Sequence, residues 1–225
     1  MTLIGVGITT HNRADIFAYC HEHWKQHLPA GAVLVVVDDA SAVPCPDATY
    51  RFDVNVGAPT AKNKCLQLLM DAGCEHLFLA DDDIHPTSPH WWEPYINSPQ
   101  PHLCWARPRR RRLSTTRTVD GHIVTDWPSG AVLYMTRHVV NTVGGYDADT
   151  FGAVGFDHAN YSDRIHAYGL TAWRFADAQH TGELFTGPAT QSAVAAEDRS
   201  DERMREAKRN RERLKDTAYH VPLGQ

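Results

Sequence analysis

The sequence predicts an α/β protein with a mostly parallel central sheet. Three short apolar segments, 3–9, 32–37 and 75–80, are rich in the β-branched and aliphatic residues that strands prefer, and polar side chains follow each of them. Helical patterns separate the three segments, and the connections are short. Strands that alternate with helices in this way are typical of a parallel sheet flanked by helices.

The first half of the chain supplies these elements in order. A helix is expected over 14–27, because Pro29 and Gly31 interrupt the pattern that follows. Segment 32–37 is apolar at every position, as expected for a strand that is covered on both faces. A short strand and a second helix are expected at 51–54 and 61–71.

Beyond residue 85 the predicted elements are shorter. Asp120-Gly121 is typical of a two-residue hairpin turn, because both residue types tolerate a positive φ. The expected strands and helices of this half are strands 103–106, 121–126, 131–135 and 171–175 and helices 137–143 and 159–167.

The end of the chain changes character. Residues 197–216 contain eight Lys/Arg and seven Asp/Glu, a composition that indicates a solvated helix or a frayed tail. We therefore expect one domain over 1–187, followed by a charged C-terminal helix or tail over 188–225.

Composition excludes several classes of protein. With 42% hydrophobic and 22% charged residues the chain can bury a core, which excludes wholesale disorder. No run of 18 apolar residues is present, so no transmembrane segment is expected. The N-terminus lacks the features of a signal peptide, which favours a cytoplasmic location. A net charge of −5 argues against a generic basic nucleic-acid binder, although a local basic patch remains compatible with it.

Polar clusters stand at the ends of the three predicted strands. They are Thr10-His11-Asn12-Arg13, Asp38-Asp39 and Asp81-Asp82-Asp83. Because ligands bind at the carboxyl ends of strands in an open parallel sheet, we expect the three clusters to converge on one crevice. The Asp38-Asp39 pair fits hydrogen bonding to a base or a ribose, or the capping of its own loop.

The aspartate run carries the clearest chemistry. Three adjacent carboxylates repel one another, and a divalent cation relieves that repulsion. Oxygen ligands suit Mg²⁺ or Mn²⁺, and carboxylates at i and i+2, such as Asp81 and Asp83, can face one ion. A solvated, aspartate-rich turn is the alternative interpretation.

Two further segments suggest a reaction centre. Residues 57–63 begin with glycine and open a helix, which makes Lys62 available to a phosphate or a base. Asp157 is expected at a helix N-terminus, which favours its charged form and suits a general base. The alternative for Asp157 is an ordinary helix N-cap.

Taken together, these segments resemble a family 2-type glycosyltransferase of the GT-A fold. The resemblance rests on the ordered set THNR, VVVDDAS, GAPTAKN, FLADDDI, SGAVLYMTR and VGGYDADTFGAVGFDHANYSDRIHAYGL, which spans about residues 3–175. The last segment is also similar to that of metal-dependent galactosyltransferases with a GGEDDD-type motif.

The resemblance implies a nucleotide-sugar donor, usually a UDP-sugar, and a divalent cation, Mn²⁺ or Mg²⁺. It assigns the nucleotide cradle to Thr10, His11 and Arg13, and uracil and ribose contacts to Asp38 and Asp39. It assigns donor contacts to Lys62, Asp81 and Asp82, with the metal held by Asp81, Asp83 and His180 in a DxD arrangement. The register within the three aspartates stays open.

The chain departs from the family at the catalytic pair. The family's Glu-Asp pair becomes Asp157-His158 here, so the base is Asp157 or His158, and we favour Asp157. The resemblance also favours inversion at the anomeric carbon. Two other functions remain open: a phosphohydrolase that uses Asp81 and Asp83, and a non-catalytic module that binds nucleotide sugars or nucleic acid.

The acceptor is less defined by the sequence. A run of four cations on an acidic protein fits an anionic acceptor such as DNA or another polyanion, and it also fits a solvated loop. A tryptophan pair can stack on a sugar or a base, or lie on a buried helix face. The candidate acceptor residues are Arg109, Arg110, Arg111, Arg112, Trp91 and Trp92.

Overall fold

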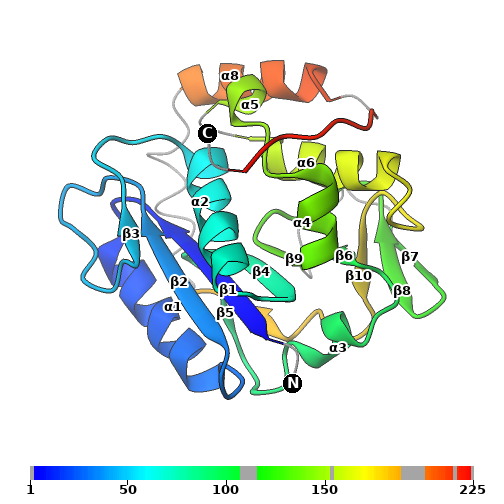
Figure 1. The fold of residues 1–225 in the computed structure, drawn as a ribbon, viewed down its shortest axis with the longest axis horizontal. Helices are drawn as coiled ribbons and strands as arrows, with labels where there is room; N and C mark the ends of the chain where they lie inside the picture. The colour runs from blue at the N-terminus through cyan, green and yellow to red at the C-terminus, as the bar shows by residue number, and fades with distance from the viewer. Residues whose placement is uncertain (1–2, 107–115, 153–154, 189–200, 215–216, 224–225) are drawn as a thin grey trace.

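A six-stranded sheet forms the centre of the molecule, with strand order β3-β2-β1-β4-β9-β6 (Figure 1). The computed structural model describes residues 3–106, 116–152, 155–188, 201–214 and 217–223. The strands of this sheet are β1 (Ile4–Thr10), β2 (Val33–Asp38), β3 (Tyr50–Arg51), β4 (His76–Asp81), β6 (His102–Cys104) and β9 (Val132–Thr136).

The sheet is mixed but mostly parallel. β1 pairs with β2 and β4 in parallel, and β2 pairs with β3 in parallel. β9 is antiparallel to both of its neighbours, β4 and β6. The register opposes Thr10 to Asp38 and Thr9 to Asp81, so the ends of these strands meet at one edge. The predicted α/β fold with a mostly parallel sheet is confirmed.

Apolar clusters fill both faces of the sheet. Successive strand residues point to opposite faces, and β4 shows this clearly. Phe78 belongs to the cluster that includes Trp24 of α1 (Ala14–His27). Leu77 and Leu79 belong to the cluster that includes Leu66 of α2 (Ala58–Asp71). One face of β1, β2 and β4 is therefore covered by α1 and the other by α2.

Smaller elements complete the fold. A three-stranded sheet has the order β10-β8-β7, and β11 pairs with β5. The strands are β5 (His85–Pro86), β7 (Thr116–Val119), β8 (His122–Thr125), β10 (Ala176–Ala178) and β11 (Phe185–Thr186). The helices are α3 (Glu93–Ile96), α4 (Arg137–Val143), α5 (Ala148–Phe151), α6 (Asp157–Ala167) and α8 (Asp201–Glu212).

The hairpin prediction is confirmed. Val119 pairs with His122, which leaves Asp120 and Gly121 as a two-residue turn. Both have a positive φ, 48° and 74°, as a type I′ turn requires. By contrast, the strand expected at 171–175 is wrong, because pairing with β8 begins only at Ala176.

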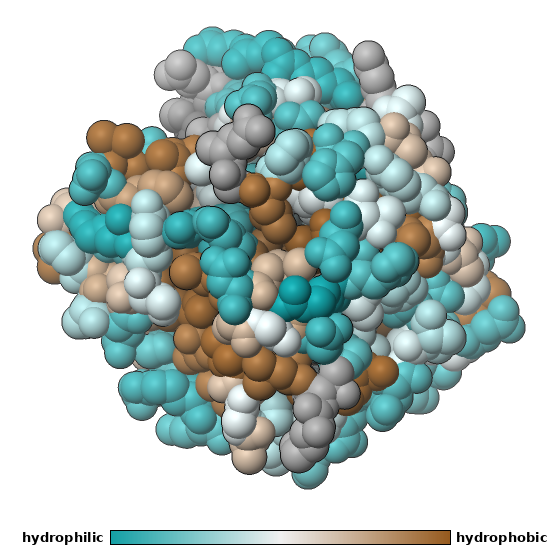
Figure 2. All heavy atoms as spheres, in the orientation of Figure 1, coloured by the Kyte–Doolittle hydropathy of each residue, from teal (hydrophilic) through white to brown (hydrophobic). Residues whose placement is uncertain are grey.

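The charged C-terminal helix lies on the outside of the domain but is attached to it. Figure 2 shows the upper edge, where α8 runs, as hydrophilic. Asn210 is nevertheless buried, and its side-chain amide donates to the carbonyls of Phe151 and Gly155. The division into domains at residue 187 stays a prediction. Within the described ranges, no helix combines the length and apolar character needed to cross a membrane.

Candidate active site

Side chains from the ends of β1 and β4 bind one another. Thr10 Oγ1 donates to Asp82 Oδ2 at 2.8 Å. The Arg13 guanidinium donates to Asp82 Oδ1 at 2.6 Å and to Asp83 Oδ2 at 2.9 Å. The structure therefore brings together two of the three polar clusters that the sequence singled out.

The three aspartates differ in orientation. Asp82 is 4% exposed, and both of its oxygens accept from Thr10 or Arg13. Burial, together with the neighbouring Asp83 and Asp81, raises the pKa of Asp82 to about 7 against the opposing effect of Arg13. The side chains of Asp81 and Asp83 are 40% and 22% exposed. Asp81 and Asp83 therefore have oxygens that a ligand can reach, whereas the buried Asp82 forms an ion pair with Arg13.

Lys62 connects the aspartates to the helix α6. Its Nζ lies 3.2 Å from Asp81 Oδ1, and its side chain is only 6% exposed. Burial lowers the pKa of Lys62, but the charges of Asp81 and Asp157 outweigh that effect and raise it. Asp81 belongs to β4 and Asp157 to α6, so carboxylates from two elements interact electrostatically with the buried Lys62.

Asp157 is the first residue of α6 and is almost buried, at 7% exposure. Its Oδ2 is buried and has no hydrogen-bond partner among the described residues. Burial raises its pKa, but His158, whose Nδ1 lies 3.7 Å from Asp157 Oδ1, and the charge of Lys62 bring it down to about 2. The N-cap of the helix is Phe156, so the alternative of Asp157 as an N-cap is wrong.

The Asp38-Asp39 pair holds its own loop. Asp38 is fully buried and accepts from the backbone of Ser41 and Cys45 and from Arg51. Burial raises the pKa of Asp38, but these hydrogen bonds outweigh it and lower the pKa. Asp38 therefore holds its own loop in this structure, and its assignment to a nucleotide contact stays a prediction.

Asp39 and His11 lie beside this loop. Asp39 accepts from the backbone of Val56 and Gly57 at 2.7 and 2.9 Å. The ring of His11 is bound through Nδ1 to the carbonyl of Asp39 at 2.5 Å. Nucleotide contacts by Asp39 and His11 stay predictions.

Other candidates are not gathered at this site. Trp91 is fully buried in the turn before α3 and donates its indole N–H to the carbonyl of His27, so it packs in the core without lying on a helix. Its assignment as a stacking wall stays a prediction. Trp92 is half-buried, and its role stays a prediction. His180 is exposed in the turn after β10. Arg109 to Arg112 lie outside the described residues.

The described residues contain no preformed group of three His, Cys, Asp or Glu side chains that could hold a metal ion. Asp81, Asp83 and His180 therefore do not form a closed site by themselves. Their assignment as metal ligands stays a prediction.

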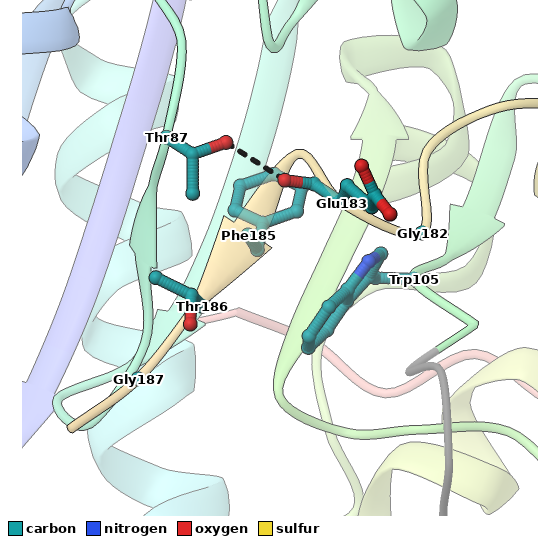
Figure 3. A pocket seen from close by; sticks show the side chains of 7 residues that line it. All are labelled: Thr87, Trp105, Gly182, Glu183, Phe185, Thr186 and Gly187. Carbon is teal, nitrogen blue, oxygen red and sulfur yellow. Dashed lines mark hydrogen bonds between the residues drawn. The ribbon is translucent and has the colours of Figure 1, made fainter. Parts of the chain in front are cut away.

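A pocket of about 470 Å³ is lined by Thr87, which follows β5, by Trp105 and by residues of the segment 182–187, which contains β11. Figure 3 shows the Thr87 hydroxyl donating to the carbonyl of Glu183 at one side of the pocket and the Trp105 ring at the other. Trp105 and Phe185 are buried, so Thr87, Glu183 and Thr186 form the accessible wall. Sequence reasoning missed this pocket, because Thr87 and Trp105 lie 77 or more residues before the segment 182–187 in the chain.

Comparisons with known proteins support the fold. No family model matches the chain, and no curated protein does. Among solved structures, the mannosyltransferase PcManGT from Pyrobaculum calidifontis, in complex with GDP-Man and Mn²⁺, gives a TM-score of 0.59 at 17% identity over 79% of this chain. The catalytic domain of Drosophila beta1,4galactosyltransferase 7 with xylobiose gives 0.55 at 12% identity, covering 86% of this chain and 73% of that one.

TarS from S. aureus gives a TM-score of 0.56 at 11% identity, covering 87% of this chain and 63% of that one. The chain spans 55% of the length of the mannosyltransferase structure. At these identities the similarity concerns the fold and not the substrates. The strand order, the mostly parallel sheet and the three structural matches together show that the chain has the fold of the GT-A glycosyltransferases.

Proposed function

We propose that the chain is a glycosyltransferase that moves a sugar from a nucleotide sugar, in our assignment a UDP-sugar, to an acceptor hydroxyl with inversion. One observation carries the proposal. The Nζ of the buried Lys62 lies 3.2 Å from Asp81 Oδ1, and the charge of Asp157, whose Oδ2 has no hydrogen-bond partner among the described residues, also raises the pKa of Lys62. The carboxylate assigned to the donor, Asp81, and the carboxylate assigned as general base, Asp157, therefore both interact with the ammonium group of Lys62.

The ligands bound in the matched structures support the choice of a nucleotide-sugar donor and a divalent cation. PcManGT is in complex with GDP-Man and Mn²⁺, and a variant of the Drosophila galactosyltransferase is in complex with manganese, UDP-Gal and xylobiose. They also define the alternatives for the donor base, uracil or guanine.

The carboxylates fit a divalent cation that arrives with the donor. Mg²⁺ is usually held by one or two carboxylates together with substrate phosphates and water, so a closed group of three protein ligands is not required. Asp81 and Asp83 would hold the ion, with His180 as the third assigned ligand. When bound, the cation neutralises the charge that develops on the leaving diphosphate.

The residues of the chain perform the remaining tasks. Asp157 accepts the proton of the acceptor hydroxyl as the new bond forms between that oxygen and the anomeric carbon. The bond from the anomeric carbon to the diphosphate oxygen breaks on the opposite side, which inverts the configuration. Arg13 holds the Asp82 and Asp83 carboxylates in place, and Lys62 favours the ionised form of Asp157, which is the form a base requires.

A screen of UDP- and GDP-sugars for thermal stabilisation tests the proposal. A UDP-sugar at about 100 times its Kd should stabilise the folded chain by about 2.7 kcal/mol, and only with Mn²⁺ or Mg²⁺ present. Asp83→Ala should remove the metal-dependent part of that stabilisation, whereas Glu93→Gln on the outer helix α3 should keep it.

The same samples separate the alternatives. Release of nucleoside diphosphate from the stabilising donor supports a transferase. Release of inorganic phosphate from a phosphomonoester would identify a phosphohydrolase, and donor binding without turnover would identify a binding module. UDP affinity that is unchanged by EDTA would contradict the metal-dependent site.

A further inference from the structure

Residues 219–223, hereafter the C-terminal segment, lie against the loop that joins α4 to α5. The Val221 N–H donates to the carbonyl of Val143 at 3.0 Å, and Gly145 N–H donates to the carbonyl of Val221 at 2.7 Å. Gly144 has a φ of 75°, and a Cβ built on it would lie 1.6 Å from the Val221 oxygen. No residue with a side chain fits at Gly144 while the segment is docked.

The opposite side of the same loop is fixed by α2. The Asn63 side chain accepts from the Tyr146 N–H at 2.6 Å and donates to the Tyr146 carbonyl at 2.9 Å. A Cβ on Gly145 would lie 2.4 Å from Asn63 Oδ1. The glycine pair is therefore held between α2 on one side and the C-terminal segment on the other.

The Tyr219 hydroxyl connects this loop to the start of α6. It donates to Asp147 Oδ2 at 2.8 Å and accepts from Asn160 Nδ2 at 3.0 Å. Asn160 is 2% exposed and lies three residues after Asp157, in the first turn of the helix. Figure 1 shows the C-terminal segment, in red, passing between α8 and α6.

A buried arginine strengthens the connection. Arg164 is fully buried, and its guanidinium donates to the carbonyls of Val143, Gly145 and Tyr219. Its Nε donates to Asn160 Oδ1 at 3.1 Å, and its Cζ lies 4.9 Å from the centre of the Tyr219 ring. A buried charge that loses such partners is costly, so undocking the segment would disturb α6.

The first turn of α6 needs this support. Its N-cap, Phe156, has a φ of 69° and a side chain that cannot accept a hydrogen bond, so the turn has no side-chain cap from that residue. Asp157 Oδ2 has no partner among the described residues that would fix it directly. Asp157 Oδ1 lies 3.7 Å from His158 Nδ1, and both residues belong to this same turn, so the position of the Asp157 carboxylate follows the position of the turn.

We propose that the C-terminal segment is a positioning element for the catalytic base, and that Tyr219 is its positioning residue. The inference rests on the proposed function for its kinetic part. Tyr219 touches no candidate substrate group; it holds Asn160, and through Asn160 the turn that carries Asp157. Tyr219 thereby supports a site whose base lies on a helix far earlier in the chain; Asn160, the residue that it holds, is 59 positions away.

Tyr219→Phe tests the proposal, because it removes the hydroxyl and keeps the ring over Arg164. A displacement of about 1 Å at a reacting group can lower turnover up to ~10²-fold, so we expect kcat for sugar transfer to fall about tenfold or more. The calorimetric Kd for UDP with Mn²⁺ should stay within about twofold of the wild type, since the donor carboxylates on β4 are untouched. Tyr19→Phe on the exposed side of α1 is the matched control and should leave both values unchanged.

A second variant and a second measurement separate positioning from general stability. Val221→Pro deletes the N–H that binds the Val143 carbonyl and should lower kcat in the same way without touching Tyr219. In both variants the amides of the first turn of α6 should exchange with solvent faster, while those of β1 and β4 should not. Unchanged kcat in both variants, or equal losses of kcat and UDP affinity, would overturn the proposal.

Failure of the proposed function gives a different pattern. If the wild-type chain transfers no sugar from any donor, the glycosyltransferase assignment is wrong. The exchange experiment still decides the structural half: unchanged exchange in α6 of Tyr219→Phe would show that the segment does not hold the helix.

Discussion

At the scale of single residues, the surroundings of Asp157 combine burial with opposing charge. Its carboxylate is buried, yet its pKa is held at about 2 by His158 and Lys62 against the effect of burial. The group is therefore ionised throughout the neutral range, which is the form that a general base requires. Its Oδ2 is buried and has no hydrogen-bond partner among the described residues.

Asp157→Asn should lower kcat about 10²- to 10⁴-fold, the usual range for loss of a general base. The amide keeps the shape of the side chain, so the Kd for UDP and Mn²⁺ should stay near that of the wild type. Steady-state kinetics and calorimetry on the same preparation measure the two effects. If His158→Ala abolishes turnover and Asp157→Asn does not, the base is His158.

At the scale of elements, one histidine joins the edge strand β6 to α6. His102 is 4% exposed, binds the Tyr134 carbonyl through Nδ1 at 2.7 Å and Ser162 Oγ through Nε2 at 2.8 Å. Burial lowers its pKa to about 4, despite the hydrogen bond to Tyr134. The neutral imidazole is thus part of the packing between the sheet and the helix that carries Asp157.

This burial predicts a loss of stability in acid. His102 binds a proton in the unfolded chain below about pH 6.5 but in the folded chain only near pH 4, so its contribution is present above pH 6.5 and is lost as the pH falls toward 4. A difference of about 2.5 pKa units corresponds to about 3 kcal/mol. Urea unfolding from pH 7 to pH 4 measures this loss as a difference between the wild type and a variant that lacks the imidazole.

The His102→Gln variant isolates the effect, because glutamine does not titrate. Asp82 and Asp177, whose pKa values burial raises to about 7, act in the opposite direction: stability from them rises as the pH falls. Both proteins contain Asp82 and Asp177, so the contributions of these two groups cancel in the difference between the free energies of unfolding of wild type and variant. A free energy of unfolding with the same pH dependence in both proteins would contradict the role given to His102.

At the scale of the whole molecule, the regular parts of the fold were predictable from local pattern. Helices 14–27 and 137–143 are observed with the predicted bounds, as α1 and α4, and strands β1, β2 and β4 lie within one residue of prediction. Continuous apolar runs and clear breakers define such elements. β10 was misplaced because Ala-Asp-Ala has no strand character of its own and forms a strand only through β8.

The candidate site was predictable only in part, for a related reason. Strand ends converge in any parallel sheet, so the meeting of Arg13 with Asp82 and Asp83 followed from the order of elements. The burial of Asp38 depends on a loop that folds back onto it, and local pattern does not encode that return. Tyr219 binds Asn160 and Asp147, which precede it by 59 and 72 residues, and local pattern does not encode such distant contacts. The stretch YHVPL after the charged run was nevertheless a usable signal that the chain returns to the core.

The four consecutive arginines, Arg109 to Arg112, give a prediction for the molecule as a whole. Ala106, three residues before Arg109, donates its N–H to the buried carboxylate of Asp177 at 2.7 Å. If the acceptor is a polyanion, its binding should weaken steeply with salt, because each neutralised phosphate releases counterions. Replacing the four arginines with serine should raise the acceptor KM and flatten its salt dependence, while donor hydrolysis is unchanged. An acceptor KM that ignores both salt and the replacement would point to a neutral acceptor.

The docking of residues 219–223 also has a consequence for how the protein matures during translation. The strands β1, β2 and β4 and the aspartate run are complete in the first 83 residues of the nascent chain. Asp157 follows 74 residues later, and Tyr219, which holds the first turn of its helix, another 62 residues after that. A domain folds as a unit, so under the proposed function the helix that carries Asp157 reaches its final position only when residues 219–223 have left the ribosome. A chain that stops before Tyr219 would therefore keep the donor carboxylates but lack the contacts that align the base.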